Sequence, residues 1–578
     1  MSDEHPCRIR AQRGFSVRFR GKTLLSTVDP VGQAERAAEA APLRDSTLYL
    51  CPSPLFGYGL SRLLDRIEAG GLDSAILCVE ADRELMNLSL EGDPDETGTL
   101  PALLRRPRLS MLGIAGAGPR PEETPEESAE QVCAFVRRHW GSRRFRRVEA
   151  LRLSGAWQLY PELYAALAEA LRAGIAADWS NAMTLVKLGR RYTRNLIRNL
   201  AFIPRCPSLA ALSYGRDPIL VLGAGPSLDP FLRVLANHSP QIIIDERNFR
   251  IVCVDTAVPS LKARGIRPDL VIALESQQWN LRDFIGARGW GVPLAMDLSA
   301  LPATARVLGG PCYSFFTPWT RMALFKRLEA AGLLPEQFPP LGSVGLSAVA
   351  AALRLSAGPM IVCGIDFSFT ADSYHARSTP GHREKLRGQN RFRGILNPAA
   401  AFRGGAFAAL SKSGQLVRSD PAMRNYRDLF EQEFAGEERL KDTEGSGLPL
   451  GIPSLSHEAA AAILWAGTGE GPGTGGEKPG IRAGTADYDK ARRLTSFIQK
   501  ELEALGRLRD ILQGKCSAGP GELDSLLDFC DCLWAHFPEC AAADRRPQTV
   551  DISFLKRVRT EIEPLMGLWE LTLAACED

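Results

Sequence analysis

Residues 219–229 read ILVLGAGPSLD, which is an apolar run, a glycine turn and the beginning of a helix. Four consecutive apolar residues are typical of a parallel strand that is buried on both faces. Gly223 permits a tight turn, and Gly225 leaves room for a ligand to approach the backbone because glycine has no Cβ. Pro226 suits the first turn of a helix, where Ser227 adds a hydroxyl and the free N–H groups attract phosphate oxygens. The stretch predicts a ligand site between a strand and a helix; a glycine-rich turn that binds nothing is the alternative.

Two residues of this stretch narrow the class of ligand. Leu228 and Asp229 occupy the neighbourhood in which the dinucleotide fingerprint has its third glycine. The missing glycine counts against an NAD-dependent enzyme. The pattern therefore favours a mononucleotide.

The same order of apolar run, polar residue and helix recurs along the central part of the chain. Such alternation predicts an α/β fold with a doubly wound, Rossmann-like sheet, and ligands of these sheets bind outside the carboxyl ends of the strands. Further strand-like runs are Ile251–Val254, Leu270–Leu274, Pro293–Met296 and Met360–Cys363, and the residues that follow or end them include Asp255, Glu275, Asp297 and Gly364.

Several polar residues at these strand ends are candidates for the site. Asp255 is suited to accept hydrogen bonds from a ribose or a base, or to cap the next helix. Glu275 ends the third strand and is expected to face the same crevice. Gly342 and Ser343 precede a helix at Ala348–Leu355, where they would bind a phosphate or a sugar, or only cap the helix.

The candidates for catalysis follow the late strand. Asp366 is placed to hydrogen-bond a sugar or a catalytic group. His375 is a candidate general base because the ordinary pKa of histidine lies near neutral pH. A solvated loop histidine is the alternative.

The flanking regions predict two further domains. Thr47–Leu50, Leu60–Ile67 and Ser74–Val79 read as strand, helix and strand, which predicts a smaller N-terminal Rossmann-like domain. Phe56 and Tyr58 are bulky for a phosphate-binding turn, so this domain is expected to be structural. The predicted domains are an N-terminal domain at 1–175, a central domain at 176–466 and a helical C-terminal domain at 481–578 that is suited to docking or oligomerisation. Residues 91–128 are expected to form an exposed linker or a long excursion, and the Gly-rich residues 467–480 a flexible linker.

Composition excludes several classes of protein. With 45% hydrophobic and 24% charged residues the chain is globular, and a net charge of +3 gives no basic field for nucleic acid. Its 13 scattered cysteines predict free thiols in a reducing compartment. The spacing of Cys530, Cys532 and Cys540 predicts no metal site. Because no stretch resembles a signal peptide or a membrane span, we expect a cytoplasmic protein.

These motifs together resemble a known family. Residues Pro218–Leu228, Ile251–Val258, Gly265–Gln277, Gly342–Ala348 and Gly364–Ala376 resemble the motility-associated factor (Maf) flagellin glycosyltransferases. The central domain is also similar to bacterial sialyltransferases and to 6-hydroxymethylpterin diphosphokinases.

The resemblance implies a reaction and roles for individual residues. A nonulosonic acid would move from a CMP donor to Ser or Thr hydroxyls of flagellin, with no obligatory cofactor or metal. By the resemblance, the residues that contact CMP are Gly223, Gly225, Pro226 and Ser227. Asp255 would lie near the ribose or cytosine, and Gly342 and Ser343 would line the donor pocket. Asp366 and His375 match an acidic and a histidine position late in the family's sequence. Residues 442–447, DTEGSG, resemble a later Thr-x-Gly-Gly element in which Ser446 replaces a glycine.

Two other functions stay open. One is a diphosphokinase that uses ATP and Mg²⁺ on a pterin-like alcohol. The other is a non-catalytic chaperone that binds flagellin without a nucleotide.

Overall fold

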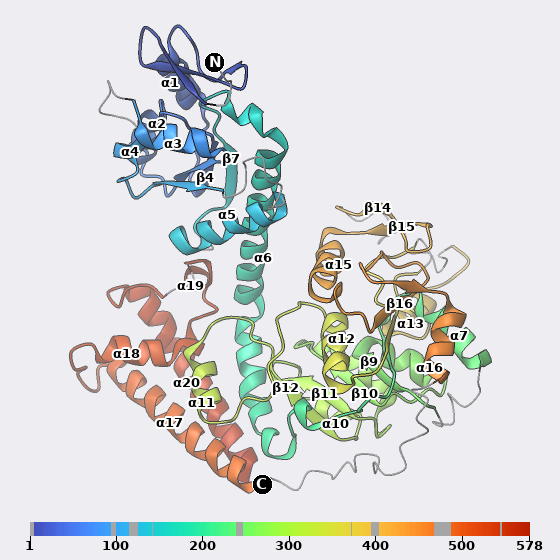
Figure 1. The fold of residues 1–578 in the computed structure, drawn as a ribbon. Helices are drawn as coiled ribbons and strands as arrows, with labels where there is room; N and C mark the ends of the chain where they lie inside the picture. The colour runs from blue at the N-terminus through green and yellow to red at the C-terminus, as the bar shows by residue number, and fades with distance from the viewer. Residues whose placement is uncertain are drawn as a thin grey trace. The chain divides into compact units, whose positions relative to one another are not determined.

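The computed structural model describes residues 5–93, 100–114, 125–141, 143–238, 247–370, 373–392, 394, 404–466, 487–543 and 546–577. It divides into two compact units, residues 1–187 with 535–547 and residues 188–534 with 548–578. Figure 1 shows a parallel sheet in each unit. The predicted linker 467–480 lies outside the described residues.

The larger unit contains an eight-stranded sheet in the order β12-β11-β10-β9-β8-β13-β16-β17, and every neighbouring pair is parallel. The strand order reverses between β8 and β13, so the predicted doubly wound α/β fold is confirmed. The strands are β8 (Ile219–Leu222), β9 (Arg250–Val254), β10 (Leu270–Ala273), β11 (Leu294–Asp297), β12 (Cys312–Phe315), β13 (Met360–Cys363), β16 (Leu440–Thr443) and β17 (Ser454–Leu455).

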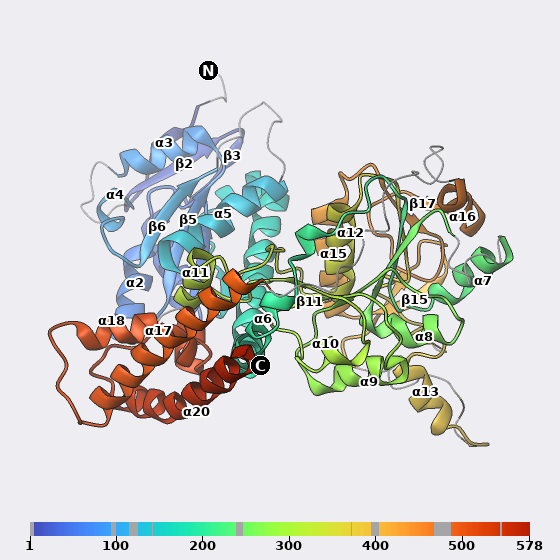
Figure 2. The same cartoon turned by 90° about the horizontal axis from the view of Figure 1, so that it is seen from below.

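Helices cover both faces of this sheet, which explains why its central strands are apolar throughout. Figure 2 shows α8, α9 and α10 on one face and α12 on the other. The helices of this unit include α7 (Leu228–His238), α8 (Val258–Lys262), α9 (Leu281–Phe284), α10 (Thr304–Val307), α11 (Ala323–Ala330), α12 (Val344–Leu355), α13 (Pro380–Arg387), α15 (Pro421–Phe434) and α16 (His457–Ala466). This unit also contains an antiparallel hairpin of β14 (Phe407–Leu410) and β15 (Leu416–Ser419).

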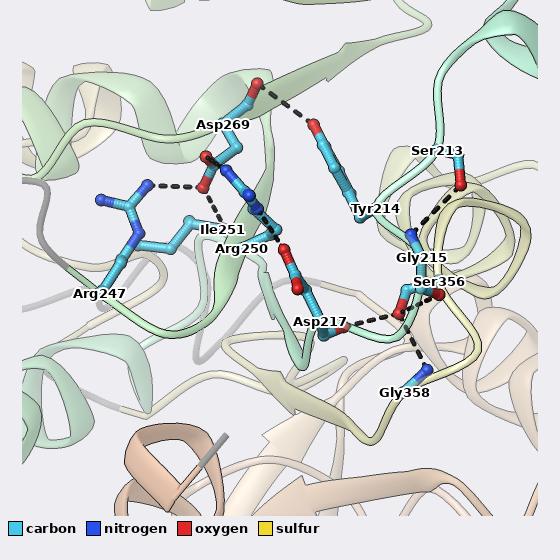
Figure 3. A network of polar contacts seen from close by, with 10 residues as sticks. All are labelled: Ser213, Tyr214, Gly215, Asp217, Arg247, Arg250, Ile251, Asp269, Ser356 and Gly358. Atoms are coloured by element: carbon cyan, nitrogen blue, oxygen red, sulfur yellow. Dashed lines mark hydrogen bonds and ion pairs between the residues drawn. The ribbon is translucent and has the colours of Figure 1, made fainter. Parts of the chain in front are cut away.

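A network of charged side chains joins the amino ends of β8, β9 and β10 (Figure 3). Asp269 accepts hydrogen bonds from the Ile251 N–H at 2.7 Å and from the Arg247 guanidinium at 2.5 Å. Arg250 donates to Asp217 at 2.8 Å and contacts Asp269 at 3.4 Å. Asp269 therefore fixes the start of β10 against β9, at the end of the sheet opposite to the predicted site.

Two asparagines of the long helix α6 (Pro161–Leu200) hold the loops at the carboxyl ends of β10 and β11. Asn195 Nδ2 donates to the Ser276 and Ser299 carbonyls, both at 3.0 Å. Asn199 Nδ2, one turn later, donates to the Leu298 and Ala300 carbonyls, both at 2.8 Å.

Replacing Asn195 with alanine is expected to lower the free energy of unfolding by about 1–3 kcal/mol, because two carbonyls would lose their buried donor. Urea unfolding measures the loss. Asn181→Ala, at an exposed position of the same helix, is the matched control and should change the free energy of unfolding by about 0.5 kcal/mol or less. Equal losses in the two variants would contradict the role given to Asn195.

The smaller unit confirms the predicted N-terminal Rossmann-like fold. Its parallel sheet has the order β6-β5-β4-β7. The elements are β1 (Cys7–Arg10), β2 (Phe15–Phe19), β3 (Lys22–Thr23), α1 (Pro30–Ala40), β4 (Thr47–Pro52), α2 (Leu60–Ala69), β5 (Ala75–Glu80), α3 (Arg83–Glu91), α4 (Leu100–Leu103), β6 (Leu109–Gly113), α5 (Pro125–Trp140) and β7 (Arg147–Ala150). Phe56 and Tyr58 belong to its hydrophobic core. The prediction of a linker over 91–128 is wrong at β6, whose short apolar run pairs with β5.

The end of the chain is helical, as predicted. Its helices are α17 (Tyr488–Leu512), α18 (Glu522–Phe529), α19 (Pro538–Ala543) and α20 (Ile552–Glu577), and α17 packs along α20. None of the described helices is both long and apolar enough to cross a membrane. All 13 cysteines are free thiols in this structure.

Candidate functional site

A cavity of about 230 Å³ lies at the carboxyl ends of β8 and β13, where the strand order reverses. This is the position at which doubly wound sheets bind their ligands. Its lining comes from five parts of the chain: Gly223, Ala224, Gly225, Val254, Thr256, Ser343, Val344, Gly345, Gly364, Ile365, Asp366, Phe367, Ser368, Tyr374, His375, Met423 and Tyr426. Five of the ten predicted site residues therefore line one cavity: Gly223, Gly225, Ser343, Asp366 and His375.

Two glycine turns meet at the base of this cavity. The Gly223 N–H donates to the Cys363 carbonyl and the Gly225 N–H to the Gly364 carbonyl, both at 2.8 Å. A Cβ on Gly223 would lie 2.2 Å from the Gly364 oxygen, and a Cβ on Gly225 would lie 2.4 Å from Asp366 Oδ2. Both glycines border the cavity, but close packing between the two turns already requires them.

Ser227 and Asp366 form a buried pair beside these turns. The Ser227 N–H donates to Asp366 Oδ2 at 2.8 Å, and Ser227 Oγ donates to Oδ1 at 2.5 Å. Ser227 is 1% exposed, and neither it nor Pro226 lines the cavity. The Asp366 carboxylate therefore occupies the start of α7, where the sequence predicts a phosphate.

A second helix start borders the cavity directly. Ser343 caps α12, since its Oγ accepts from the Gly345 N–H at 3.3 Å, and Ser343, Val344 and Gly345 all line the cavity. A helix start carries partial positive charge and attracts anions. Gly342 stands outside the lining, where its positive φ of 69° favours glycine. Ser343 thus caps its helix and also faces the cavity.

The predicted carboxylates of β9 and β10 lie next to the cavity lining. Asp255 is 2% exposed and accepts from the Thr256 N–H at 2.7 Å and from Asn280 Nδ2 at 2.8 Å. Burial raises the pKa of Asp255. Glu275 is exposed and accepts from the Gln277 N–H at 2.9 Å. Thr256, which follows Asp255, lines the cavity, whereas Asp255 and Glu275 are not among the lining residues.

His375 borders the cavity with its neighbour Tyr374. The two rings meet edge to face, with centroids 4.8 Å apart. Burial, together with the charge of Lys385, lowers the pKa of His375 to about 4. The imidazole is therefore neutral at pH 7 but a weaker base than an ordinary histidine, so the near-neutral pKa on which its prediction as a general base rested is not found.

The cavity also has an aromatic wall that the sequence interpretation missed. The Phe367 and Tyr426 rings have centroids 6.2 Å apart, and Met423 lies on the same helix as Tyr426. Phe367 has a φ of 48°, which is unusual for a side chain of its size, and Ser419 Oγ donates to its carbonyl at 2.8 Å. The Asp420-Pro421 dipeptide, a helix cap followed by proline, is the sequence signal for α15.

A buried ion pair behind the cavity was missed as well. Lys412 Nζ donates to Asp442 Oδ2 at 2.7 Å, and the side chains are 3% and 2% exposed. Burial raises the pKa of Asp442 to about 6, although Lys412 opposes this rise. The Asp442–Gly447 element packs here: a Cβ on Gly445 would lie 2.7 Å from Ser227 Cβ, and Ser446 accepts through its carbonyl from Ser368 Oγ at 2.6 Å.

Within the described ranges, no group of three or more His, Cys, Asp or Glu residues is placed to hold a metal ion. The expectation that the protein works without a metal stays a prediction.

The chain is similar to a protein family, to a curated protein and to a solved structure. Residues 194–372 match the model of the family described as 6-hydroxymethylpterin diphosphokinase MptE-like. An uncharacterized protein of Treponema pallidum (strain Nichols) is 28% identical over 580 residues, which cover 97% of this chain and 95% of that protein. The solved structure of a Maf glycosyltransferase from Magnetospirillum magneticum AMB-1 superposes with a TM-score of 0.54 and 16% identity, covering 99% of this chain and 92% of that one. The family match confirms the predicted similarity to 6-hydroxymethylpterin diphosphokinases over residues 194–372, and the structural match shows that the chain shares the fold of a Maf glycosyltransferase.

Proposed function

We propose that this protein is a cytoplasmic glycosyltransferase that moves a nonulosonic acid from a CMP donor to Ser or Thr residues of flagellin. The observation that carries the proposal is the cavity at the reversal of strand order, which joins a helix start, an aromatic wall and a neutral histidine. The likeness in fold to a Maf glycosyltransferase supports the reaction class. The sugar, CMP and flagellin come from the resemblance of the motifs.

The lining residues suggest how a CMP-sugar would be held. The single phosphate would lie at the start of α12, near Ser343 and Gly345, and the pyrimidine would pack against Phe367 and Tyr426. One helix start suits one phosphate. The glycine turn at Gly223 would leave room for the nucleoside.

The transfer itself would be a displacement at the anomeric carbon. The acceptor hydroxyl oxygen forms the new bond, the bond from the anomeric carbon to the phosphate oxygen breaks, and CMP leaves with that electron pair. His375, neutral at pH 7, would take the proton of the hydroxyl. The helix start would stabilise the charge on the leaving phosphate.

Thermal unfolding with nucleotides tests the donor. CMP at about 100 times its dissociation constant should stabilise the fold by about 2.7 kcal/mol. Cytidine is the matched control for the phosphate, and AMP is the control for the base. Because the central domain matches the MptE-like family, ATP with Mg²⁺ and 6-hydroxymethylpterin form the competing arm. Stabilisation by that arm and not by CMP would favour the diphosphokinase.

Intact-mass spectrometry of flagellin tests the acceptor. Flagellin from cells that lack this protein should lose the mass of one or more nonulosonic acids relative to flagellin from wild-type cells. Expressing the His375→Gln variant in the deletion strain separates an enzyme from a non-catalytic chaperone. The variant of an enzyme should leave the glycan absent, whereas a chaperone with this substitution would still restore it. An unchanged pattern in the deletion strain would remove flagellin as the acceptor.

A further inference from the structure

Two helical segments beside the cavity leave large apolar side chains in solvent. Trp279 is 70% exposed and Ile285 is 64% exposed, on the consecutive helical turns 278–287 that contain α9. Leu386 of α13 is 43% exposed. Single exposed apolar residues are normal on a soluble protein, whereas a group of them on one surface indicates a binding partner.

An arginine joins the two segments, which lie next to each other (Figure 2). The Arg282 guanidinium lies over the Trp279 ring, 5.2 Å from its centroid, and pairs with Glu384 of α13 at 3.4 Å. Arg383 also reaches the first segment, because a Cβ on Gly286 would lie 3.6 Å from Arg383 Nη1. The three- and four-residue spacings within each segment place its exposed residues on one face. We call this surface the α9–α13 patch, and it consists of Trp279, Arg282, Ile285, Arg383, Leu386 and Arg387.

The α9–α13 patch is cationic. The exposed charged residues of 278–288 and 380–388 are four arginines and one glutamate: Arg282, Arg288, Arg383, Arg387 and Glu384. The glutamate pairs with Arg282, so the two segments carry an excess of three positive charges. Tryptophan and arginine are the residues that contribute most to binding at protein interfaces. This composition therefore suits an acidic protein segment.

The composition suits a membrane surface less well. A helix that binds in the membrane interface needs a broad apolar face. Within α13, all of which the structure describes, Leu386 is the only exposed large apolar side chain. The observations therefore favour a protein partner.

Both segments of the patch contact residues of the candidate site. Asn280, immediately before α9, donates through Nδ2 to Asp255 at 2.8 Å, and the next residue, Thr256, lines the cavity. On α13, a Cβ on Gly381 would lie 3.7 Å from His375 Nδ1. The patch therefore lies beside the proposed base, where the hydroxyl of an acceptor protein has to arrive.

We propose that the α9–α13 patch is the docking surface for the acceptor protein. It would bind an acidic segment of that protein through its arginines and pack an apolar side chain of the segment against Trp279 and Ile285. This assignment rests on the proposed function, because it gives the acceptor of that reaction its place on the enzyme. The competing occupants are a second copy of this chain and an anionic membrane.

Steady-state kinetics with flagellin test the docking surface. W279A and the double variant R383E/R387E should each raise the KM for flagellin at least about 10-fold, because they remove an aromatic anchor or reverse the charge. The kcat at saturating flagellin and the affinity for CMP should stay near the wild-type values, since none of these residues lines the cavity. That division between KM and kcat also shows that the variants are folded.

Matched controls come from exposed positions of α17 and α20. Tyr488→Ala removes an aromatic side chain that is 84% exposed. K556E/R559E reverses two exposed charges on one helix, as R383E/R387E does. Both controls should leave the KM for flagellin near that of the wild type. An equal rise in KM in the controls would overturn the assignment.

Salt gives a second readout, which a purely structural role would not move. The wild-type KM for flagellin should rise between about 0.1 M and about 1 M salt, as the Debye length falls from about 10 Å to about 3 Å. R383E/R387E should lose most of this rise, whereas W279A should keep it. The same salt dependence in R383E/R387E and in the wild type would contradict recognition by the arginines.

Direct binding separates this proposal from the proposed function. Flagellin binding to the immobilised protein without CMP should weaken in W279A and in R383E/R387E. Weakened binding in a protein that transfers no sugar would support the patch and count against the proposed function. Sugar transfer with an unchanged KM in both variants would overturn the patch and leave the proposed function standing. Normal flagellin binding, together with loss of a dimer or loss of binding to anionic lipid vesicles, would overturn the proposal in favour of a competing occupant.

Discussion

His375→Gln is expected to lower the rate of sugar transfer at saturating donor by about 100-fold or more, because the acceptor hydroxyl would lose its general base. CMP affinity should change little, since the donor contacts proposed for Ser343, Phe367 and Tyr426 remain. Glutamine keeps much of the size of the ring and cannot take up the proton. Steady-state rates with flagellin and isothermal titration with CMP measure the two effects separately.

The pKa of His375 gives this prediction a second test. Burial and the Lys385 charge lower that pKa to about 4, so the imidazole stays neutral well below pH 7. The rate at saturating donor should therefore not decline through the ordinary histidine range, around about pH 6.5. It should decline only as the pH approaches about 4.

His382→Gln is the matched control for this variant. His382 is half-buried on α13, seven residues away in sequence, and accepts at Nδ1 from the Ser378 N–H at 3.2 Å. It lies outside the cavity lining. Its replacement should leave the rate near that of the wild type. A similar loss in both variants, or full activity in His375→Gln, would contradict the role given to His375.

The fold was predictable where the information is local. Three apolar runs are followed by glycine or an acidic residue: Ile219–Leu222, Ile251–Val254 and Met360–Cys363. The corresponding strands of the structure begin and end within one residue of these predicted bounds. Strand β6 and helix α15 were missed because each lies within a stretch rich in polar or loop-forming residues. Their formation depends on partners far away in the sequence, such as β5 for β6.

The candidate site was predictable in position but only partly in its contacts. Gly223 and Gly225 border the cavity, yet the carbonyl and carboxylate that exclude a side chain there belong to Gly364 and Asp366, which come much later in the chain. The start of α7 has the sequence of a phosphate site, but Asp366 already occupies it. Only the tertiary structure reveals that competition.

Lys412 illustrates the same limit. The stretch Ser411-Lys412-Ser413-Gly414 has the composition of an exposed hairpin turn. Its burial follows from Asp442 and Gly447, which lie on a different element. No local pattern separates this lysine from a solvated one.

Asp269→Ala is expected to lower the free energy of unfolding by about 3–5 kcal/mol, because it removes one partner of a buried ion pair. The Arg247 side chain is 3% exposed and would keep its bond to the Arg267 carbonyl but lose the Asp269 carboxylate. The Ile251 N–H would lose its acceptor at the start of β9. Urea unfolding measures the loss, and Asp269→Asn should recover part of it by accepting from Ile251.

Asp217→Ala is the matched control from the same network (Figure 3). The Asp217 side chain is 42% exposed and pairs with Arg250 at 2.8 Å, so its loss should cost about 1 kcal/mol or less. Both residues lie at the amino ends of the strands, away from the cavity at the carboxyl ends. Folded Asp269→Ala protein should therefore bind CMP with nearly wild-type affinity. Equal destabilisation by the two substitutions would mean that exposure does not decide the strength of these ion pairs. Loss of CMP binding in folded Asp269→Ala protein would mean that the two ends of the sheet are coupled.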